Sequence, residues 1–158
     1  MRIYIVSLVA EAIGVQLGKW FDLAEYVSVA DLEADIYHEL TMFEYEVRTV
    51  DAPFKVDPRM SLEELLAIQE KLDDPCHGEA FELYANYQGD VQYALDYFDE
   101  AYQGEWPSME DFAHDFLMEV DEEYRAAYES CRGWSPDIDL VAFHCDFTEI
   151  DGHIFQAV

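Results

Sequence analysis

The chain has 158 residues, of which 36 are Asp or Glu and only 8 are Lys or Arg, so its formal net charge at pH 7 is −28. High charge usually accompanies low hydrophobicity and disorder, but 51% of the residues are hydrophobic and 15% are aromatic, so we expect the chain to fold. The charge excludes nucleic acid as a partner, because counterion release from phosphates requires Lys and Arg, and it favours a basic partner.

Residues 1–59 are expected to form an N-terminal α+β module. Alternating apolar residues predict strands over residues 2–9 and 18–23. Residues 43–50 alternate in the same way and predict a third strand.

One helix is predicted within this module, starting after Ser28. Asp31 lies three residues further on and completes a variant of the capping box. The apolar residues that follow recur every four positions, at Leu32, Ile36 and Leu40. Pro53 and Pro58 mark the end of the module near residue 59.

Residues 60–103 are expected to form a central, acidic and helical module. Ser61 and Glu64 make a capping box for a first helix, and Asp90 precedes a second one. Both helices carry an apolar stripe, formed by Leu62, Leu65, Leu66 and Leu72 in the first and by Val91, Leu95, Phe98 and Tyr102 in the second.

Residues 104–158 are expected to form a C-terminal α+β module. Ser108 and Asp111 cap its first helix, whose apolar residues are Met109, Phe112, Phe116, Val120 and Tyr124. The opposite face of this helix carries acids at i, i+4 and i+8, and two more are expected to continue it: Asp111, Asp115, Glu119, Glu122 and Glu123. Like charges at this spacing destabilise a helix by a few tenths of a kcal/mol per pair. Because no Lys lies between them, this face favours a functional negative field.

The end of the C-terminal module is predicted to contain a helix and a strand. Ser135, followed by Pro136 at the first helical position, predicts a helix start. The buried stripe of this helix is expected to consist of Ile138, Val141, Ala142 and Cys145. Asp151-Gly152 predicts a turn, and residues 153–158 predict the final strand.

The amount of charge is comparable with that of a short DNA duplex. Twenty-eight net charges correspond to about 14 base pairs, or roughly 48 Å of duplex, because DNA carries about one charge per ~1.7 Å of axis. A compact globule of this length has a radius of gyration of only ~15 Å. If the chain imitates DNA, it should therefore be elongated. Together with the strands and helices expected above, this predicts an α+β fold, an elongated chain of small modules.

The charge is concentrated in residues 61–130, which contain 20 acids and only two bases, Lys71 and Arg125. The common interpretation of such a concentration of acids is a solvated helix face that keeps the protein soluble. The functional interpretation is a surface that imitates the phosphates of DNA. The acids expected to form this surface are Glu63, Glu64, Glu70, Asp73, Asp74, Asp96, Asp99, Glu100, Asp111, Asp115, Glu119, Glu122 and Glu123.

Metal and catalytic sites have little support in the sequence. A calcium-binding loop with Gly152 at its sixth position needs acids where the chain has Phe147 and Val158. The pairs Cys76-His77 and His144-Cys145 lack the ligand spacing of structural zinc sites, which favours core cysteines. No phosphate-binding loop or nucleophile motif is present. We therefore expect no metal, no cofactor and no enzymatic activity.

The sequence also carries an expectation about location. Cys76, Cys131 and Cys145 are odd in number and form no CxxC pair, which is typical of free thiols in a reducing compartment. No run of about 18 apolar residues occurs, so no membrane span is expected. Residues 1–12 predict a strand better than a secretory signal. We expect a cytoplasmic protein.

Several segments together resemble the ArdA-type antirestriction proteins. The segments Arg2–Leu8, Gly18–Asp22 and Glu44–Asp51 resemble the first three strands of that family, and Gly152–Phe155 resembles its closing strand. Residues Tyr102–Ala113 are similar to its Tyr-x-Gly turn and the Ser-capped helix that follows. The chain departs from the family pattern at Glu11-Ala12-Ile13-Gly14 and at Leu17-Gly18.

The resemblance implies a dimeric, three-module DNA mimic that occupies the DNA-binding groove of type I restriction–modification enzymes. As a dimer it would present 56 net charges, or about 28 base pairs by the same phosphate spacing. Two alternatives share the composition. One is an acidic inhibitor or chaperone-like binder of another basic DNA-binding protein, and the other is a solubilising, halophilic type of surface without a partner.

Overall fold

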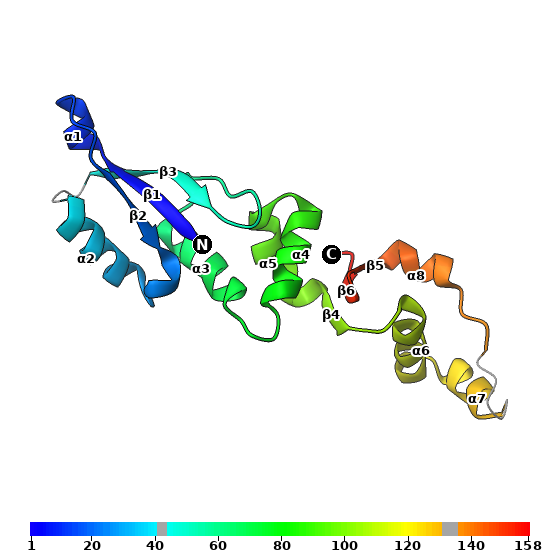
Figure 1. Cartoon of the computed structure of the whole chain (residues 1–158). Helices are drawn as coiled ribbons and strands as arrows, with labels where there is room; N and C mark the ends of the chain where they lie inside the picture. The colour runs from blue at the N-terminus through cyan, green and yellow to red at the C-terminus, as the bar shows by residue number, and fades with distance from the viewer. Residues whose placement is uncertain (41–43, 131–135) are drawn as a thin grey trace. The chain divides into compact units, whose positions relative to one another are not determined.

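A three-stranded antiparallel sheet forms from the first part of the chain in the computed structural model, which describes residues 1–40, 44–130 and 136–158 (Figure 1). The strands are β1 (Arg2–Ser7), β2 (Gly18–Asp22) and β3 (Tyr45–Asp51), in the order β2-β1-β3. Ile3 and Ile5 of the central strand are fully buried. The alternation predicted for this region is confirmed.

The first strand ends at Ser7, two residues before its predicted end, because a helix begins at Leu8. Helix α1 spans Leu8–Ala12, and Ser7 caps it by accepting a hydrogen bond from the Ala10 amide at 3.2 Å. The Ser7 side chain is buried. A capping residue at this point ends β1, since its side chain satisfies an amide that has no partner within the helix.

Helix α2 (Val29–Leu40) covers the sheet and starts where the sequence predicts. The Asp31 amide donates to the Ser28 hydroxyl at 3.2 Å. Leu32, Ile36 and Leu40 are all buried, as their spacing predicts. A short 3₁₀ helix, η1 (Leu23–Glu25), joins β2 to the loop before α2.

Three further helices follow the sheet: α3 (Leu62–Leu72), α4 (Gly78–Gln88) and α5 (Val91–Ala101). Ser61 and Glu64 form the predicted capping box of α3. Leu62 and Leu65 belong to the same apolar core as the sheet residues Ile3 and Ile5. The core therefore continues across the predicted module boundary near residue 59.

The chain divides into two compact units, Met1–Asp96 and Tyr97–Val158. This division is not the same as the predicted division at residues 59 and 103, because α3 shares the core of the N-terminal sheet. Separate folding of the modules 1–59, 60–103 and 104–158 stays a prediction.

The second unit contains another three-stranded antiparallel sheet, in the order β4-β6-β5. Its strands are β4 (Tyr102–Glu105), β5 (Phe147–Ile150) and β6 (His153–Gln156). Asp151 and Gly152 form the turn between β5 and β6 with φ values of 48° and 84°. The predicted turn is confirmed, and both residues adopt the left-handed conformation that hairpin turns of this length require.

Three helices accompany this sheet: α6 (Met109–Val120), α7 (Glu122–Ser130) and α8 (Leu140–Asp146). Phe112 lies in the apolar core of the unit with Met109, Phe147 and Ile154. Its ring lies 4.9 Å from that of Phe147 and 5.6 Å from that of Trp106, centroid to centroid. The expected α+β fold class is confirmed.

The predicted helix through Tyr124 is wrong in one respect, because two helices take its place. Asp121 ends α6 in an extended conformation and then accepts hydrogen bonds from the amides of Glu123 and Tyr124 at 2.8 and 3.0 Å. Val120, expected in the buried stripe, is 59% exposed. The competing cap at Asp121 outweighs the apolar spacing.

The predicted stripe of the last helix is also wrong. Asp139 caps α8, which begins at Leu140, and Leu140 and Phe143 pack against the core. Val141 is 77% exposed, Ala142 and Cys145 are exposed, and Ile138 precedes the helix. The later start turns the predicted stripe outward. The predicted cap Ser135 lies outside the described residues.

Two smaller expectations are also corrected. Tyr102 was expected to extend the stripe of α5, but it is the first residue of β4 and stacks on Phe98 with a centroid distance of 5.3 Å. Cys76 and Cys145 are exposed, so they are not core cysteines, and Cys131 lies outside the described residues. Within the described residues, no helix is both long enough and apolar enough to cross a membrane.

Candidate functional site: an acidic helical surface

The acids expected to form the functional surface all reach solvent. Eleven of the thirteen are exposed, and Glu64 and Asp74 are half-buried. These two acids accept structural hydrogen bonds: Glu64 from the Ser61 amide at 2.8 Å, and Asp74 from the Cys76 amide at 2.8 Å. Glu64 and Asp74 therefore stabilise local backbone structure, whereas the other eleven acids are exposed to solvent.

In the first unit, α3 carries the first three predicted acids, Glu63, Glu64 and Glu70, and Asp73 is its C-cap residue. Its buried side consists of Leu62, Leu65, Ile68 and Gln69. Because α3 packs this side on the core, Glu63 and Glu70 project outward at a spacing of two turns.

Helix α5 carries Asp96, Asp99 and Glu100, all exposed. Asp96 accepts a hydrogen bond from the side-chain Nε2 of Gln92 at 3.0 Å, one turn earlier. Asp99 and Glu100 lie in the last turn, which contains no basic residue. Carboxylates at a helix C-terminus face the negative end of the helix dipole, so this placement is unfavourable for the helix itself.

In the second unit, α6 carries the predicted series Asp111, Asp115 and Glu119, and all three are exposed. Asp111 lies in the first turn and accepts a hydrogen bond from the Ser108 hydroxyl at 2.6 Å. Glu119 lies in the last turn, which again has no basic residue. The series begins in a favourable position and ends in an unfavourable one.

Glu122 and Glu123 do not continue this series. They form the first turn of α7, on the far side of the cap at Asp121. Acids at a helix N-terminus interact favourably with the helix dipole, so these two have a structural role of their own. Within residues 61–130, four further acids outside the predicted set and the predicted helix caps are exposed: Glu79, Glu105, Glu110 and Glu129.

The eight Lys and Arg residues are too few to offset the 36 acids. Among the described residues, five ion pairs with Lys or Arg lie before residue 60: Arg2–Asp51, Lys19–Glu39, Arg48–Glu11, Arg48–Glu46 and Arg59–Asp57. Arg125, one of only two bases in residues 61–130, donates to the carbonyl oxygens of Met118 and Glu119 at 2.8 Å each. It serves as a cap for the end of α6.

Two carboxyl groups have lowered pKa values, both for local reasons. Hydrogen bonds from the Arg59 side chain and amide lower the pKa of Asp57 to about 2. The Cys76 amide, followed by the His77 side chain, lowers the pKa of Asp74 below its usual range. Both groups stay ionised, so they add permanent negative charge near neutral pH.

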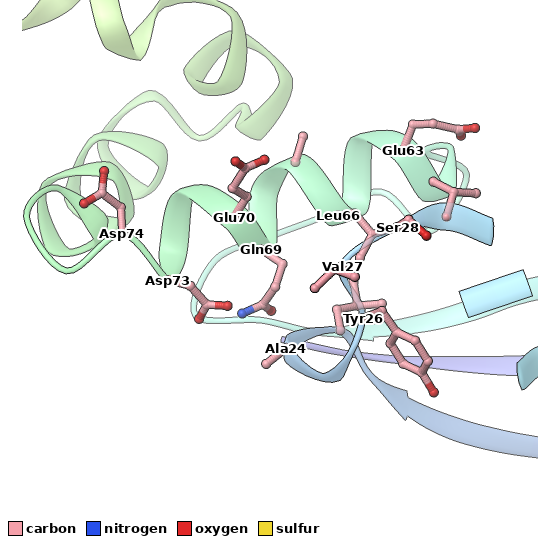
Figure 2. A pocket seen from close by; sticks show the side chains of 13 residues that line it. Ala24, Tyr26, Val27, Ser28, Glu63, Leu66, Gln69, Glu70, Asp73 and Asp74 are labelled. Carbon is pink, nitrogen blue, oxygen red and sulfur yellow. The ribbon is translucent and has the colours of Figure 1, made fainter. Parts of the chain in front are cut away.

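A groove of about 840 Å³ lies between α3 and the segment from Leu23 to Val29 (Figure 2). The segment contributes Tyr26 and Val27, and α3 contributes Leu66 and Gln69. Glu63, Glu70, Asp73 and Asp74, all predicted surface residues, also line it. The apolar part of the groove was not predicted, because Val27 precedes the helix cap at Ser28 and belongs to no periodic stripe.

The described residues contain one group of side chains close enough to share a metal ion, formed by Asp35, His38 and Glu39. Two of these already have partners: Asp35 accepts from the Tyr26 hydroxyl at 2.6 Å, and Glu39 pairs with Lys19 at 3.0 Å. The residues considered for calcium, 147–158, form the β5–β6 hairpin. His77 from the considered zinc set lies 3.1 Å from the Asp74 carboxylate.

No protein-family model and no curated protein sequence matches this chain.

Proposed function

We propose that the protein is an acidic decoy for DNA, which competes with DNA for the DNA-binding groove of a basic enzyme. Carboxylates fixed on α3, α5, α6 and α7 take the place of phosphates. The basic residues of the target, which release counterions when they bind DNA, meet these carboxylates instead. The encounter is expected to be fast because long-range attraction steers it.

One observation carries this proposal: exposed carboxylates occupy helix ends where stability favours cations. Glu100 lies in the last turn of α5 and Glu119 in the last turn of α6, and neither turn contains a basic residue, although Arg125 of α7 donates to the last carbonyl groups of α6. A surface that serves only solubility gains nothing from this placement, because the same charge at a helix N-terminus is stabilising. A selected negative field accounts for it.

The proposed target is a type I restriction–modification enzyme. This part of the proposal comes from the resemblance to ArdA-type antirestriction proteins, on segments such as Arg2–Leu8 and Tyr102–Ala113. The same resemblance supports a homodimer. The decoy mechanism itself depends only on the charge and needs a basic DNA-binding groove in the partner.

A competition experiment tests the proposal. The protein is titrated into a type I restriction–modification enzyme bound to fluorescent duplex DNA, and the release of DNA is followed by anisotropy. We expect release at near-stoichiometric amounts, with an affinity for the enzyme that falls steeply between ~50 and ~200 mM salt. An affinity that does not change with salt contradicts the decoy mechanism.

The distribution of charge gives a second expectation. Because the field is spread over many acids, neutralising any one of them is expected to change the affinity by only about twofold. Complete loss of inhibition by Asp115→Asn alone would indicate a local recognition site. A protein that unfolds below molar salt and releases no DNA would favour the halophilic alternative.

A further inference from the structure

We propose that the groove beside α3 is a docking site for a basic amphipathic helix of the partner protein. An apolar side chain of that helix lies against Leu66, and its Lys or Arg side chains pair with the surrounding carboxylates. This inference deepens the proposed function and rests on it only for the basic character of the partner. It names the element of the partner that the first unit recognises.

The wall formed by α3 has an apolar centre with acids around it. Leu66 is half-buried, and Glu63, Glu70 and Asp73 stand at i−3, i+4 and i+7 from it. Residues at these spacings lie on one side of a helix. Their side chains diverge from these positions in Figure 2: Asp73 extends on the side of Ala24, together with Gln69, whereas Glu63 and Glu70 extend away from Ala24.

On the opposite wall, Tyr26 and Val29 pack against the core, whereas Val27 does not belong to the core cluster. Val27 is 96% exposed, although it lines the groove. Its neighbour Tyr26 is held in place because its hydroxyl donates to Asp35 at 2.6 Å. An exposed apolar side chain beside a fixed aromatic ring suits contact with an apolar guest.

The charge of the groove selects a cationic guest. Four of its described lining residues are acids, Glu63, Glu70, Asp73 and Asp74, and none of those lining residues is Lys, Arg or His. Asp74 already accepts hydrogen bonds from the amides of Cys76 and His77. Pairing with a guest therefore falls to Glu63, Glu70 and Asp73, which are all exposed.

The spacing of these acids favours a helical guest. Glu63 and Glu70 are seven residues apart, which is about 10.5 Å along the axis of α3. Cations at positions i and i+7 of a partner helix have the same separation, and an apolar residue at i+3 or i+4 lies between them. The arrangement is that of an amphipathic helix bound in a groove. A polyamine matches the charge but brings no apolar side chain to Leu66.

The probe is a capped Ala-based helical peptide with Arg at i and i+7 and Leu at i+3 and i+4. A companion peptide has Gln in place of both Leu residues. Binding to the full-length protein is measured by calorimetry at constant salt. We expect one peptide per chain, and an affinity about tenfold lower for the companion peptide. Equal affinities of the two peptides would overturn the proposal, because charge alone would then account for binding.

Two pairs of variants distinguish binding in the groove from general attraction by the negative charge of the protein. Glu70→Gln/Asp73→Asn changes the groove, and Asp115→Asn/Glu119→Gln changes the net charge equally on α6. Val27→Lys places a cation at the groove, and Ala34→Lys places one on an exposed position of α2. We expect each groove variant to weaken peptide binding about tenfold or more, and each control about twofold or less. Equal losses within each pair would contradict a groove site.

The DNA competition assay on the same variants keeps the two proposals apart. If the peptide fails to bind selectively but the protein still displaces DNA, the groove inference fails and the decoy function stands. If the peptide binds in the groove but no DNA is displaced from the restriction enzyme, the docking site stands and its partner is a different basic protein.

Discussion

Asp111 and Asp115 lie one turn apart on α6 and carry the same charge, but only Asp111 supports the helix. Asp111 accepts the Ser108 hydroxyl hydrogen bond in the first turn. We predict that Asp111→Asn lowers the free energy of unfolding by ~0.5–1 kcal/mol. Asp115→Asn is expected to leave it unchanged or raise it by a few tenths of a kcal/mol, because repulsion from Asp111 and Glu119 is relieved. Urea denaturation measures both.

Asp115 is accordingly the better residue with which to probe function. Its neutralisation removes charge and leaves the cap of α6 intact. Equal destabilisation by the two variants would show that the negative charge of Asp111 in the first turn of α6 contributes nothing measurable.

Asp57 and Arg59 give a prediction about pH. The Arg59 side chain and amide lower the pKa of Asp57 from its ordinary value of 3.8 to about 2. Because the folded-state value is the lower one, the pair stabilises the fold above about pH 4, and this contribution is lost as the pH falls towards 2. We predict that Arg59→Gln moves the pKa of Asp57 back towards 3.8. Titration of the carboxyl carbon by NMR measures it, and an unchanged midpoint would rule out the assigned cause.

At the scale of helices, Glu119 and Glu122 can be compared, because they carry the same charge at opposite kinds of helix end. Glu119 lies in the last turn of α6, and Glu122 lies in the first turn of α7. We predict that Glu119→Gln raises the free energy of unfolding and that Glu122→Gln lowers it, each by ~0.3–1 kcal/mol, because the helix dipole has opposite signs at the two ends. Thermal unfolding at low salt measures both changes.

The two variants remove the same charge, so if the protein inhibits a restriction enzyme as proposed, both are expected to weaken that inhibition equally. If only the variant that loses stability also loses inhibition, the surface acts through the fold and the field interpretation fails.

Helix starts were predictable where a side chain caps them locally. Ser28, Ser61, Asp90 and Ser108 each precede a helix as expected, because the capping hydrogen bond involves residues two or three positions away. The break between α6 and α7 at Asp121 was not predictable, because Phe116, Val120 and Tyr124 keep the helical spacing across it. At Asp121 a capping side chain favours a new helix start, whereas the apolar spacing favours one continuous helix. The sequence alone does not show which of the two effects is stronger.

The candidate site could also be predicted only in part from the sequence. For the acids on α3, α5 and α6, access to solvent follows from their place opposite the apolar stripes, and the structure agrees. Glu122 and Glu123 are exposed for another reason, because they begin a separate helix, α7. The groove beside α3 was not predictable, because Val27 and Leu66 are brought together only by tertiary packing. A contact between a loop and a distant helix leaves no periodic signal in either segment.

The last prediction concerns the shape of the whole molecule. A compact chain of this length has a radius of gyration of ~15 Å, and a compact dimer has one of ~20 Å by the same scaling. A decoy that imitates roughly 14 base pairs per chain needs its charge spread along about 48 Å. We therefore predict a radius of gyration clearly above the compact value for whichever oligomer is present.

Small-angle X-ray scattering measures this radius, and the forward scattering gives the mass, so enlargement by dimerisation is separated from elongation. Repeating the measurement at ~50 mM and ~1 M salt separates a built-in shape from expansion by repulsion, because charges more than ~3 Å apart are largely screened at the higher salt. A decoy must keep its length when screened, since its carboxylates have to match phosphate positions within the target. A particle that contracts to the compact radius in salt has charge but no duplex-like form, and such a particle cannot fill a DNA-binding groove.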